Sequence, residues 1–353
     1  MRKKREYISY IALIIVSAII VLYCSFKDYK EDIIEVLKQI TPGYLAICIL
    51  AILLYHYIVG YILRQFALFY KPDYTRKAGY KNALIAALFH GITPFASGGQ
   101  FIQCYVFYQQ GIGISESASI LLMDFIVYQS TLVVYTLVCI VLRYSTFYNV
   151  NTSIFTIALL GFIINSSIIV GLWALARSYK LHTWLSTKGI YILAKLKLVK
   201  DPNSKIERLN TYLEKFNIEV ARLSTKKSLL LKSVLSNIVR LTLYYIMPYL
   251  CAKALQIDIF ANSLFDIIAL SSFVSLANSF VPLPGASGGA EVSFTLMFAD
   301  MMVHQDVIAS MLLWRFLTYY FVLFIGGVVF ARFVKEKSLR KIEEELYEDR
   351  VIQ

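Results

Sequence analysis

The chain has 353 residues, of which 58% are hydrophobic and only 16% are charged, and its formal net charge is +12 at pH 7. Soluble domains are about half apolar and about a quarter charged, so this composition excludes an ordinary soluble globular protein. Several apolar runs reach about 20 residues, enough to cross a hydrocarbon core about 30 Å thick. The positive charge lies in a few connecting segments, which favours a role in membrane topology over nucleic-acid binding. We therefore expect an all-α integral membrane protein with no nucleic-acid partner.

The first candidate span, at 7–26, follows five residues of which four are basic. This arrangement resembles a signal peptide, but the apolar run is long for one and no small-residue cleavage site follows it. We interpret it as a retained span. Further apolar runs complete a predicted set of about six transmembrane helices, at 43–64, 115–142, 153–176, 229–255 and 307–333.

The loops between these spans alternate in charge as six crossings require. The 64–81 loop and the long 177–228 connection are rich in Lys and Arg, whereas the 143–152, 256–262 and 300–306 loops are poor in them. Cytoplasmic loops carry the excess of positive charge, so both termini are expected in the cytoplasm. The 27–41 loop has a mixed charge and fits this scheme less clearly.

Two further apolar regions, 82–113 and 261–302, are each interrupted in the middle by Pro and Gly. Two full spans in each region would give ten crossings with the same sidedness, so charge alone leaves that alternative open. However, the last part of the second region, from Glu291 to Met302, is too short to span as a helix. We therefore expect two re-entrant helical hairpins, which are tolerated where protein or a watery cavity surrounds them.

The 177–228 connection contains apolar residues at helical spacing, with charged residues on the other faces. This pattern predicts an amphipathic helix at the cytoplasmic surface. The pattern fits contact with anionic lipid headgroups and packing against the bundle equally well. The 335–353 segment is a mixed-charge cytoplasmic tail, and residues 1–353 as a whole form a single polytopic membrane domain.

The two interruptions resemble each other, which indicates an internal duplication. Ala-Ser-Gly-Gly occurs at 96–99 and again at 286–289, an offset of 190. Downstream, 118–125 aligns with 309–316 at an offset of 191. We therefore define repeat 1 as about 82–142 and repeat 2 as about 261–333. Three predicted spans lie between equivalent points, so the second copy is expected to be upside down, as in many secondary transporters.

The duplicated breaks are candidate substrate-binding sites. Paired glycines let a ligand approach the backbone closely, and the helix that starts after each pair points free N–H groups at the break, where anions bind. A serine in each break could cap the helix or donate to a phosphate oxygen. The alternative is that the glycines only permit turning and tight packing. The candidate residues in the two breaks are Ser97, Gly98, Gly99, Gln100, Ser287, Gly288, Gly289 and Glu291.

Four ionisable residues lie within apolar segments, where a charge is costly and by default indicates function. Glu291 could bind a cationic headgroup, carry a proton or pair with an arginine. Asp124 and Arg315 hold equivalent repeat positions, and we expect them to form an intramembrane ion pair. Arg240 is a second candidate partner for Glu291, or a bidentate ligand for phosphate. A purely structural ion pair remains the alternative for all four.

The Pro284–Glu291 segment resembles the Pro-Gly-Gly-x-Gly-x-x-Glu signature of the lysylphosphatidylglycerol synthase/flippase family, also called multiple peptide resistance factor. The 93–100 segment resembles its earlier hairpin, and the likeness extends over about 7–335. The Ser-Gly-Gly at 287–289 of this chain departs from the Gly-Leu-Gly that is commoner in the family. The resemblance implies a protein of the bacterial plasma membrane that corresponds to the membrane half of this family, which moves aminoacylated phosphatidylglycerol between leaflets. The separate synthase domain, which uses lysyl-tRNA, is not expected within this chain.

The leading hypothesis is therefore a flippase-like lipid translocase that acts without ATP on a phospholipid, with an anionic headgroup expected. The chain has no GxxxxGK[ST] or HExxH motif, and we expect no catalytic residue, no metal and no cofactor. One alternative is a phosphatidylglycerol lysyltransferase-family protein in lipid modification and cationic-peptide resistance. Another is a membrane scaffold for a partner enzyme. A homo-oligomer is compatible with each hypothesis.

Overall fold

The structure is a computed structural model, and it describes residues 40–143, 214–259, 264–279 and 283–351, with isolated positions at 38, 162–163, 166–167, 170–171, 188 and 281. Within these residues all regular structure is helical and no strand occurs, which confirms the predicted all-α class. The predicted spans at 7–26 and 153–176 lie wholly or mostly outside the described residues. The principal helices, in chain order, are α3 (Pro42–Ala67), α4 (Arg76–Ile92), α5 (Gly98–Gln109), α6 (Ile114–Leu142), α11 (Lys227–Tyr245), α12 (Met247–Ala254), α13 (Leu264–Asn278), α14 (Gly289–Phe298), α15 (His304–Arg315) and α16 (Phe321–Val351).

Four helical stretches in the described part are long and apolar enough to cross a membrane, and they match four of the predicted spans. They are Pro42–Ala67, Ile114–Leu142, Lys227–Ala254 and His304–Glu336. The second stretch is apolar around its whole circumference, as expected for a helix that meets protein on one side and lipid on the other. The last stretch joins α15 to α16 through a π-helix at Phe316–Tyr320.

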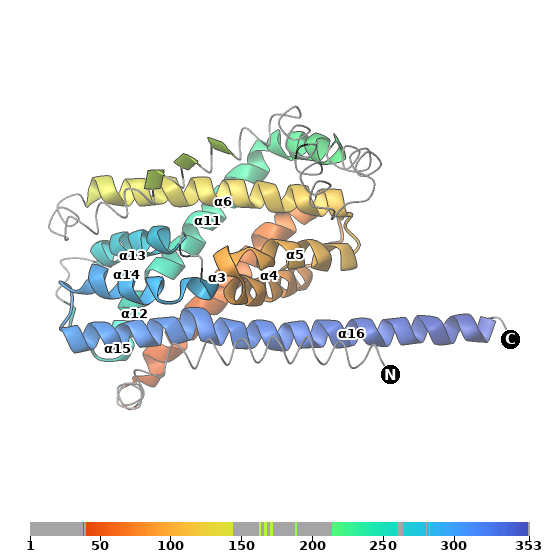
Figure 1. The fold of residues 1–353 in the computed structure, drawn as a ribbon. Coiled ribbons are helices and arrows are strands. Elements are labelled where there is room, and N and C mark those ends of the chain that lie inside the picture. The colour runs from red at the N-terminus through yellow and green to blue at the C-terminus, as the bar shows by residue number, and fades with distance from the viewer. Residues whose placement is uncertain are drawn as a thin grey trace.

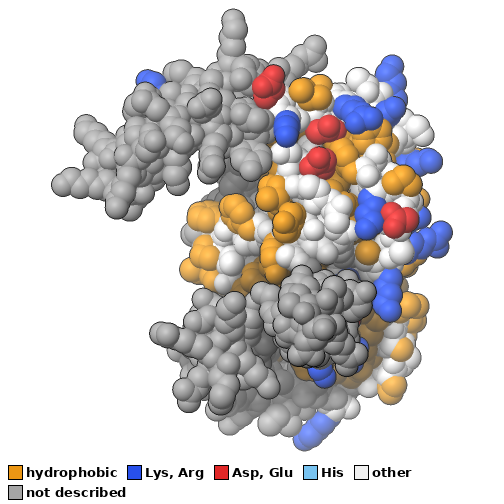
Figure 2. All heavy atoms as spheres, turned by 90° about the vertical axis from the view of Figure 1, so that its right-hand side faces the viewer, with side chains coloured by type: hydrophobic (Ala, Val, Ile, Leu, Met, Phe, Trp, Pro, Cys, Tyr) orange, Lys and Arg blue, Asp and Glu red, His pale blue; other side chains and the backbone are white. Residues whose placement is uncertain are grey.

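The basic loops lie together at one end of the bundle. The guanidinium of Arg222 lies 4.6 Å from the centroid of the Phe69 ring, and Lys226 contacts the same ring. Lys71 Nζ donates a hydrogen bond of 2.9 Å to the carbonyl of Gln110, which ties the loop before α4 to the loop after α5. Figure 2 shows Lys and Arg side chains gathered on this face, with few acidic ones between them.

The loops poor in basic residues lie at the other end. The backbone N–H of Thr41, before α3, donates to the carbonyl of Ala254 at the end of α12, at 2.7 Å. Arg143, after α6, lies 3.4 Å from the carboxylate of the buried Asp266 at the start of α13. The two classes of loop are thus separated by the length of the bundle, as the alternation of charge in the sequence predicts.

Two short antiparallel helix pairs lie between the long helices, and each pair enters and leaves at one end (Figure 1). The outer ends of α4 and α5 are joined at the basic end by a hydrogen bond of 2.5 Å from Tyr74 to the Gln110 side chain. The α13–α14 pair occupies the other half of the bundle, where Ile267 and Phe298 belong to one apolar core with Leu255. The tips of the two pairs are the proline-glycine breaks, which contact each other.

The α4 helix packs closely on α3 because both present a glycine at the crossing. A Cβ atom added to Gly60 would lie only 2.6 Å from the Cα atom of Tyr80, next to Gly79. Small residues at such crossings are typical of membrane helices, where close backbone packing drives association. This crossing holds the first broken pair firmly against a full-length span.

The part of the 177–228 connection that the structure describes begins at 214 and is helical to 224. Val220 and Leu223, on the predicted apolar face, are buried in one core cluster with Phe66 of α3. Residues 177–187 and 189–213 of the connection lie outside the described residues. For the segment at 214–224, the apolar face therefore packs on the basic end of the bundle.

Candidate functional site at the two breaks

The two breaks share a left-handed pair of residues at an offset of 190. Phe95 has φ 53° and ψ 21°, and the equivalent Gly285 has φ 60° and ψ 20°. The next residues, Ala96 and Ala286, have φ 51° and 53°. Left-handed backbone is rare for residues other than glycine, so the two breaks share an uncommon turn. They differ at the serine that follows, because ψ is −28° at Ser97 and 140° at Ser287.

The serines of both breaks are used locally, in the same way. Ser97 Oγ donates to the Pro94 carbonyl at 2.9 Å, and Ser287 Oγ donates to the Pro284 carbonyl at 2.8 Å. Neither hydroxyl caps the following helix, so the capping role considered for them is wrong. These bonds close each three-residue turn and leave the hydroxyl protons committed to the backbone.

Different groups cap the two helices that follow. In the first break the Thr93 hydroxyl accepts a hydrogen bond of 2.9 Å from the N–H of Gly98, the first residue of α5. In the second break Gly288, with φ 82°, precedes α14, and its N–H donates 2.7 Å to Glu291 Oε2. Gly288 is an extra residue in repeat 2, which explains why the offset changes from 190 to 191.

Glu291 also forms an ion pair with Arg315, and the pair joins the second break to α15. Arg315 Nε lies 2.8 Å from Glu291 Oε1, and the two side chains are 6% and 20% exposed. The guanidinium also donates to the carbonyl of Gly285 at 3.1 Å and to Ser287 Oγ at 3.4 Å. All three guanidinium nitrogens of Arg315 therefore donate hydrogen bonds to residues at the second break.

The predicted ion pair between Asp124 and Arg315 is wrong, and so is the predicted partnership of Arg240 with Glu291. Arg315 reaches its partner within its own repeat, because Glu291 caps a helix that lies beside α15. No ion pair joins Asp124 to any basic residue in the described part of the chain.

Contacts between the breaks depend on Tyr319, which lies in the π-helix. Its hydroxyl donates to the carbonyl of Gly91 at 2.9 Å, next to the first break. Its ring lies over Gly285 of the second break, and a Cβ atom there would collide with it. The wider turn of a π-helix changes the direction of the side chains that follow, and such turns often occur at functional sites.

A cavity of about 660 Å³ lies beside both breaks and between the long helices. Its lining includes Phe95 and Ala96 of the first break and Gly285 of the second. Tyr55 of α3 and Arg240 of the Lys227–Ala254 span lie near the middle of their helices, which places the cavity about halfway along the bundle. Four ionisable or amide residues singled out from the sequence line it: Gln100, Asp124, Arg240 and Arg315.

Arg240 is the most unusual group in this cavity. It is 5% exposed, it forms no ion pair with a described residue, and its buried Nε has no hydrogen-bond partner there. Its guanidinium lies 4.1 Å from the centroid of the Tyr128 ring and 5.9 Å from that of Tyr55. Aromatic faces attract a cation but do not neutralise it. Arg240 therefore presents to the cavity a guanidinium that no ion pair with a described residue engages.

Asp124 supplies a negative charge to the same cavity. Its side chain is part of the lining, and Oδ1 is buried without a hydrogen-bond partner among the described residues. The cavity thus holds one arginine and one carboxylate that do not pair, together with the closed Arg315–Glu291 pair. A buried charge without a partner is costly and is retained where it acts on a ligand or a proton.

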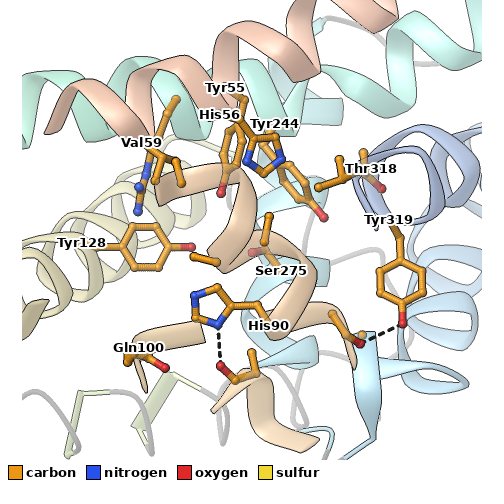
Figure 3. A pocket seen from close by; sticks show the side chains of 18 of the residues that line it. Tyr55, His56, Val59, His90, Gln100, Tyr128, Tyr244, Ser275, Thr318 and Tyr319 are labelled. Atoms are coloured by element: carbon orange, nitrogen blue, oxygen red, sulfur yellow. Dashed lines mark hydrogen bonds between the residues drawn. The ribbon is translucent and has the colours of Figure 1, made fainter. Parts of the chain in front are cut away.

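Three lining residues, His56, Tyr55 and Tyr244, were not singled out from the sequence, whereas His90 is a candidate lining residue from its place just before the first break. His56, Tyr55 and Tyr244 come from α3 and α11, and Figure 3 shows them opposite Tyr128 and His90. His90 Nδ1 donates to the carbonyl of Ala96 at 2.5 Å, which fixes its ring beside the first break. A histidine in the middle of an apolar span was the available signal for His56. The tyrosines had none, because aromatic residues are frequent throughout this chain.

The other predicted binding residues lie behind the breaks and are not part of this lining: Ser97, Gly98, Gly99, Ser287, Gly288, Gly289 and Glu291. They shape the turns and start the helices α5 and α14. No group of three or more metal-ligand side chains occurs in the described part of the chain.

The model of one protein family, described as the lysylphosphatidylglycerol synthase TM region, matches residues 10–326. The chain belongs to this family. The match covers both breaks, three of the four long apolar helical stretches and the fourth as far as residue 326, and the resemblance noted in the sequence is thereby confirmed. The chain is also 26% identical to a UPF0104 membrane protein of Archaeoglobus fulgidus over 263 residues, which are 70% of this chain and 75% of that protein. The lysylphosphatidylglycerol synthase TM region is thus an integral membrane unit here, built around the cavity between its two breaks.

Proposed function

We propose that the protein moves a phospholipid headgroup between leaflets through this cavity, without ATP. In this proposal the α4–α5 and α13–α14 pairs are re-entrant hairpins of an inverted repeat. The pairs enter from opposite ends and contact each other at their tips. The helices α5 and α14 have 12 and 10 residues, or about 18 and 15 Å, which is too short to cross a bilayer alone.

One observation supports the proposal most: Arg240 is buried, lacks a carboxylate partner and lines a cavity halfway along the bundle. A guanidinium matches two phosphate oxygens in a bidentate arrangement, and it is more weakly hydrated than an ammonium group. Lipid phosphate is the anion that membrane proteins meet at highest local concentration. The phosphate of an anionic phospholipid such as phosphatidylglycerol would supply the hydrogen-bond acceptor that Arg240 Nε lacks.

Arg315 has a different role in this proposal. Its ion pair with Glu291 and its bonds to Gly285 and Ser287 hold the second break against α15. A headgroup that reached Arg315 would have to displace these contacts. We therefore assign phosphate binding to Arg240 and assign the shaping of the cavity to the Arg315–Glu291 pair.

The orientation follows from the loops. The end that carries Lys71, Arg222 and Lys226 would face the cytoplasm, by the excess of positive charge there. On this basis both termini are cytoplasmic and the membrane is the bacterial plasma membrane. A headgroup entering from the cytoplasmic leaflet would pass the first hairpin before it reached Arg240.

The test is lipid translocation by the purified protein in liposomes. Phosphatidylglycerol with a fluorescent headgroup-proximal label is followed by its accessibility to an external quencher. We expect movement well above that of empty vesicles, and a loss of most of it in Arg240→Gln. Arg76→Gln is the matched control, since Arg76 is exposed in the first turn of α4.

Two results would contradict the proposal. One is a folded wild-type protein that moves no more lipid than empty vesicles. The other is an Arg240→Gln protein that moves lipid at the wild-type rate, because the cavity cation would then have no part in transport. Size-exclusion profiles and thermal unfolding in detergent establish that each variant is folded.

A further inference from the structure

Asp124 has no task in the proposed phosphate site, although it lines the same cavity. Its Oδ1 is buried and unpartnered, and no basic residue in the described part of the chain is ion-paired with it. We infer that Asp124 takes up a proton when a lipid phosphate binds Arg240, so that headgroup binding is coupled to proton binding. This inference rests on the proposed headgroup site at Arg240.

The charges of the cavity lining support this coupling. Arg315 and Glu291 neutralise each other. The remaining charges are the cation of Arg240 and the carboxylate of Asp124, so the empty cavity is neutral when Asp124 is ionised. A phosphodiester on Arg240 adds one negative charge in a region of low dielectric constant. The carboxylate then faces a like charge, and one proton on Asp124 restores neutrality.

The other titratable groups around Asp124 do not replace it. From α3, His56 packs edge-on against Tyr55, with ring centroids 5.0 Å apart. From α4, His90 already donates to the Ala96 carbonyl, which the neutral ring satisfies. A proton on either histidine would place a second cation beside Arg240 in the empty cavity. Neither ring carries the negative charge that an incoming phosphate would repel.

The remaining neighbours are phenols and the second arginine. Tyr128 lies on α6 itself, and Tyr244 faces the cavity from α11. Arg315 is engaged by Glu291, and Tyr319 donates to the Gly91 carbonyl. The helices α5 and α13 contribute amide and hydroxyl groups to the lining, with no titratable side chain. Asp124 is therefore the one unpaired acid in the described lining.

The step balances in charge and atoms. The Asp124 carboxylate takes up one proton from the bulk solution as the phosphate docks, and the carboxylic acid releases it to the solution when the phosphate leaves. The lipid-bound state holds more protons than the empty state, so lipid affinity decreases as the pH rises. Lipid and proton move through the cavity together, and a proton gradient drives the lipid towards the more alkaline side.

The experiment measures proton uptake on lipid binding, independently of translocation. Dihexanoylphosphatidylglycerol is added below its micelle threshold to purified protein in weakly buffered detergent solution with a pH-indicator dye. Its phosphodiester does not titrate in the range used. We expect uptake of about one proton per bound lipid, and a Kd that rises up to about tenfold per pH unit. In Asp124→Asn we expect no uptake and a Kd that does not change with pH.

The controls separate Asp124 from other groups. Asp300→Asn changes an exposed aspartate outside the cavity and should retain the wild-type proton uptake. His56→Gln and His90→Gln should retain the wild-type pH slope. Loss of uptake in either histidine variant would overturn the inference, as would uptake that persists in Asp124→Asn.

The wild-type protein alone also provides a test. Lipid binding without proton uptake overturns the coupling and leaves the headgroup site at Arg240 standing. Proton-linked binding together with no translocation in liposomes would overturn the proposed transport and leave the coupling intact. A folded wild-type protein that binds no lipid would overturn both.

Discussion

The two breaks share a backbone turn but differ in how their charges are arranged. Each contains the same left-handed pair of residues and the same serine-to-proline hydrogen bond. In the second break a carboxylate caps the helix and engages Arg315. In the first break a threonine hydroxyl caps the helix, and no acidic residue stands there.

This difference determines which arginine is available to a ligand. Glu291 neutralises the charge of Arg315 in an ion pair. The corresponding residue near the first break is Gln100, which is uncharged and lines the cavity. Arg240 lines the same cavity as Gln100 and forms no ion pair with a described residue. The second break thus carries a closed ion pair, whereas the first break borders the cavity in which we propose the anion site.

The largest effect is expected at Arg240. Replacement by Gln removes two charge-assisted hydrogen bonds, each worth about 1.5–3 kcal/mol, so the affinity for dihexanoylphosphatidylglycerol should fall by at least about 100-fold. The affinity of the Arg240→Lys variant should fall less, because lysine keeps the positive charge although it loses the bidentate geometry. Isothermal titration in detergent measures both affinities.

Arg315→Gln provides the comparison for Arg240. If only Arg240 binds the phosphate, Arg315→Gln should weaken lipid binding less than Arg240→Gln, while lowering the unfolding temperature more. Equal losses of affinity at both positions would mean that the second break is also part of the headgroup site.

A smaller effect, on stability, is expected at the closed pair. Glu291→Gln leaves the guanidinium of Arg315, which is 6% exposed, without a counter-charge. Removing one partner of a buried pair costs about 3–5 kcal/mol, and Glu291 is one-fifth exposed, so we expect a loss of about 2–4 kcal/mol. Unfolding monitored by circular dichroism in detergent and denaturant gives this free energy.

The double variant Glu291→Gln/Arg315→Gln shows whether the loss comes from the uncompensated charge. It should be more stable than Glu291→Gln alone, because no buried cation is left without a partner. If the losses of unfolding free energy from the two single substitutions add up in the double variant, the two residues act separately. The ion pair would then not be the interaction that holds the second break in place.

The sequence was sufficient for the parts of the fold that depend on composition and periodicity. Long apolar runs predicted the four helices now observed, and loop charge predicted which loops share an end. The Ala-Ser-Gly-Gly repeat predicted two similar breaks, and their φ angles agree closely. These features are local, or follow from chain segments about 20 residues long, so they can be recognised without knowing the packing.

The pairing of charges could not be predicted in the same way. Repeat symmetry suggested that Asp124 and Arg315 pair, but the helix-capping position of Glu291 and the π-helix after Arg315 direct the guanidinium elsewhere. Whether Arg240 is paired depends on side chains from α3, α6 and α11, which are far apart in the sequence. The same holds for His56, whose place in the cavity follows only from the packing of α3.

The smallest effect concerns the turn itself, and it compares equivalent residues. Gly285→Ala places a Cβ in left-handed backbone against the ring of Tyr319, so we expect a loss of about 1–3 kcal/mol. Phe95→Gly makes the first turn resemble the second and removes a strained non-glycine residue that is 65% exposed. Its unfolding free energy should change by less than about 1 kcal/mol.

The same substitutions also distinguish a shared turn from a shared function. Gly285→Ala pushes Tyr319 away from Gly91, so the contact between the two breaks should loosen. We expect both the rate of lipid translocation and the free energy of unfolding to decrease. Phe95→Gly leaves that contact in place, and translocation should persist because the Arg240 cation is unchanged. If Phe95→Gly instead stops transport while the protein remains folded, the Phe95 ring at the edge of the cavity takes part in admitting the lipid, and the first break is then more than a scaffold for the anion site.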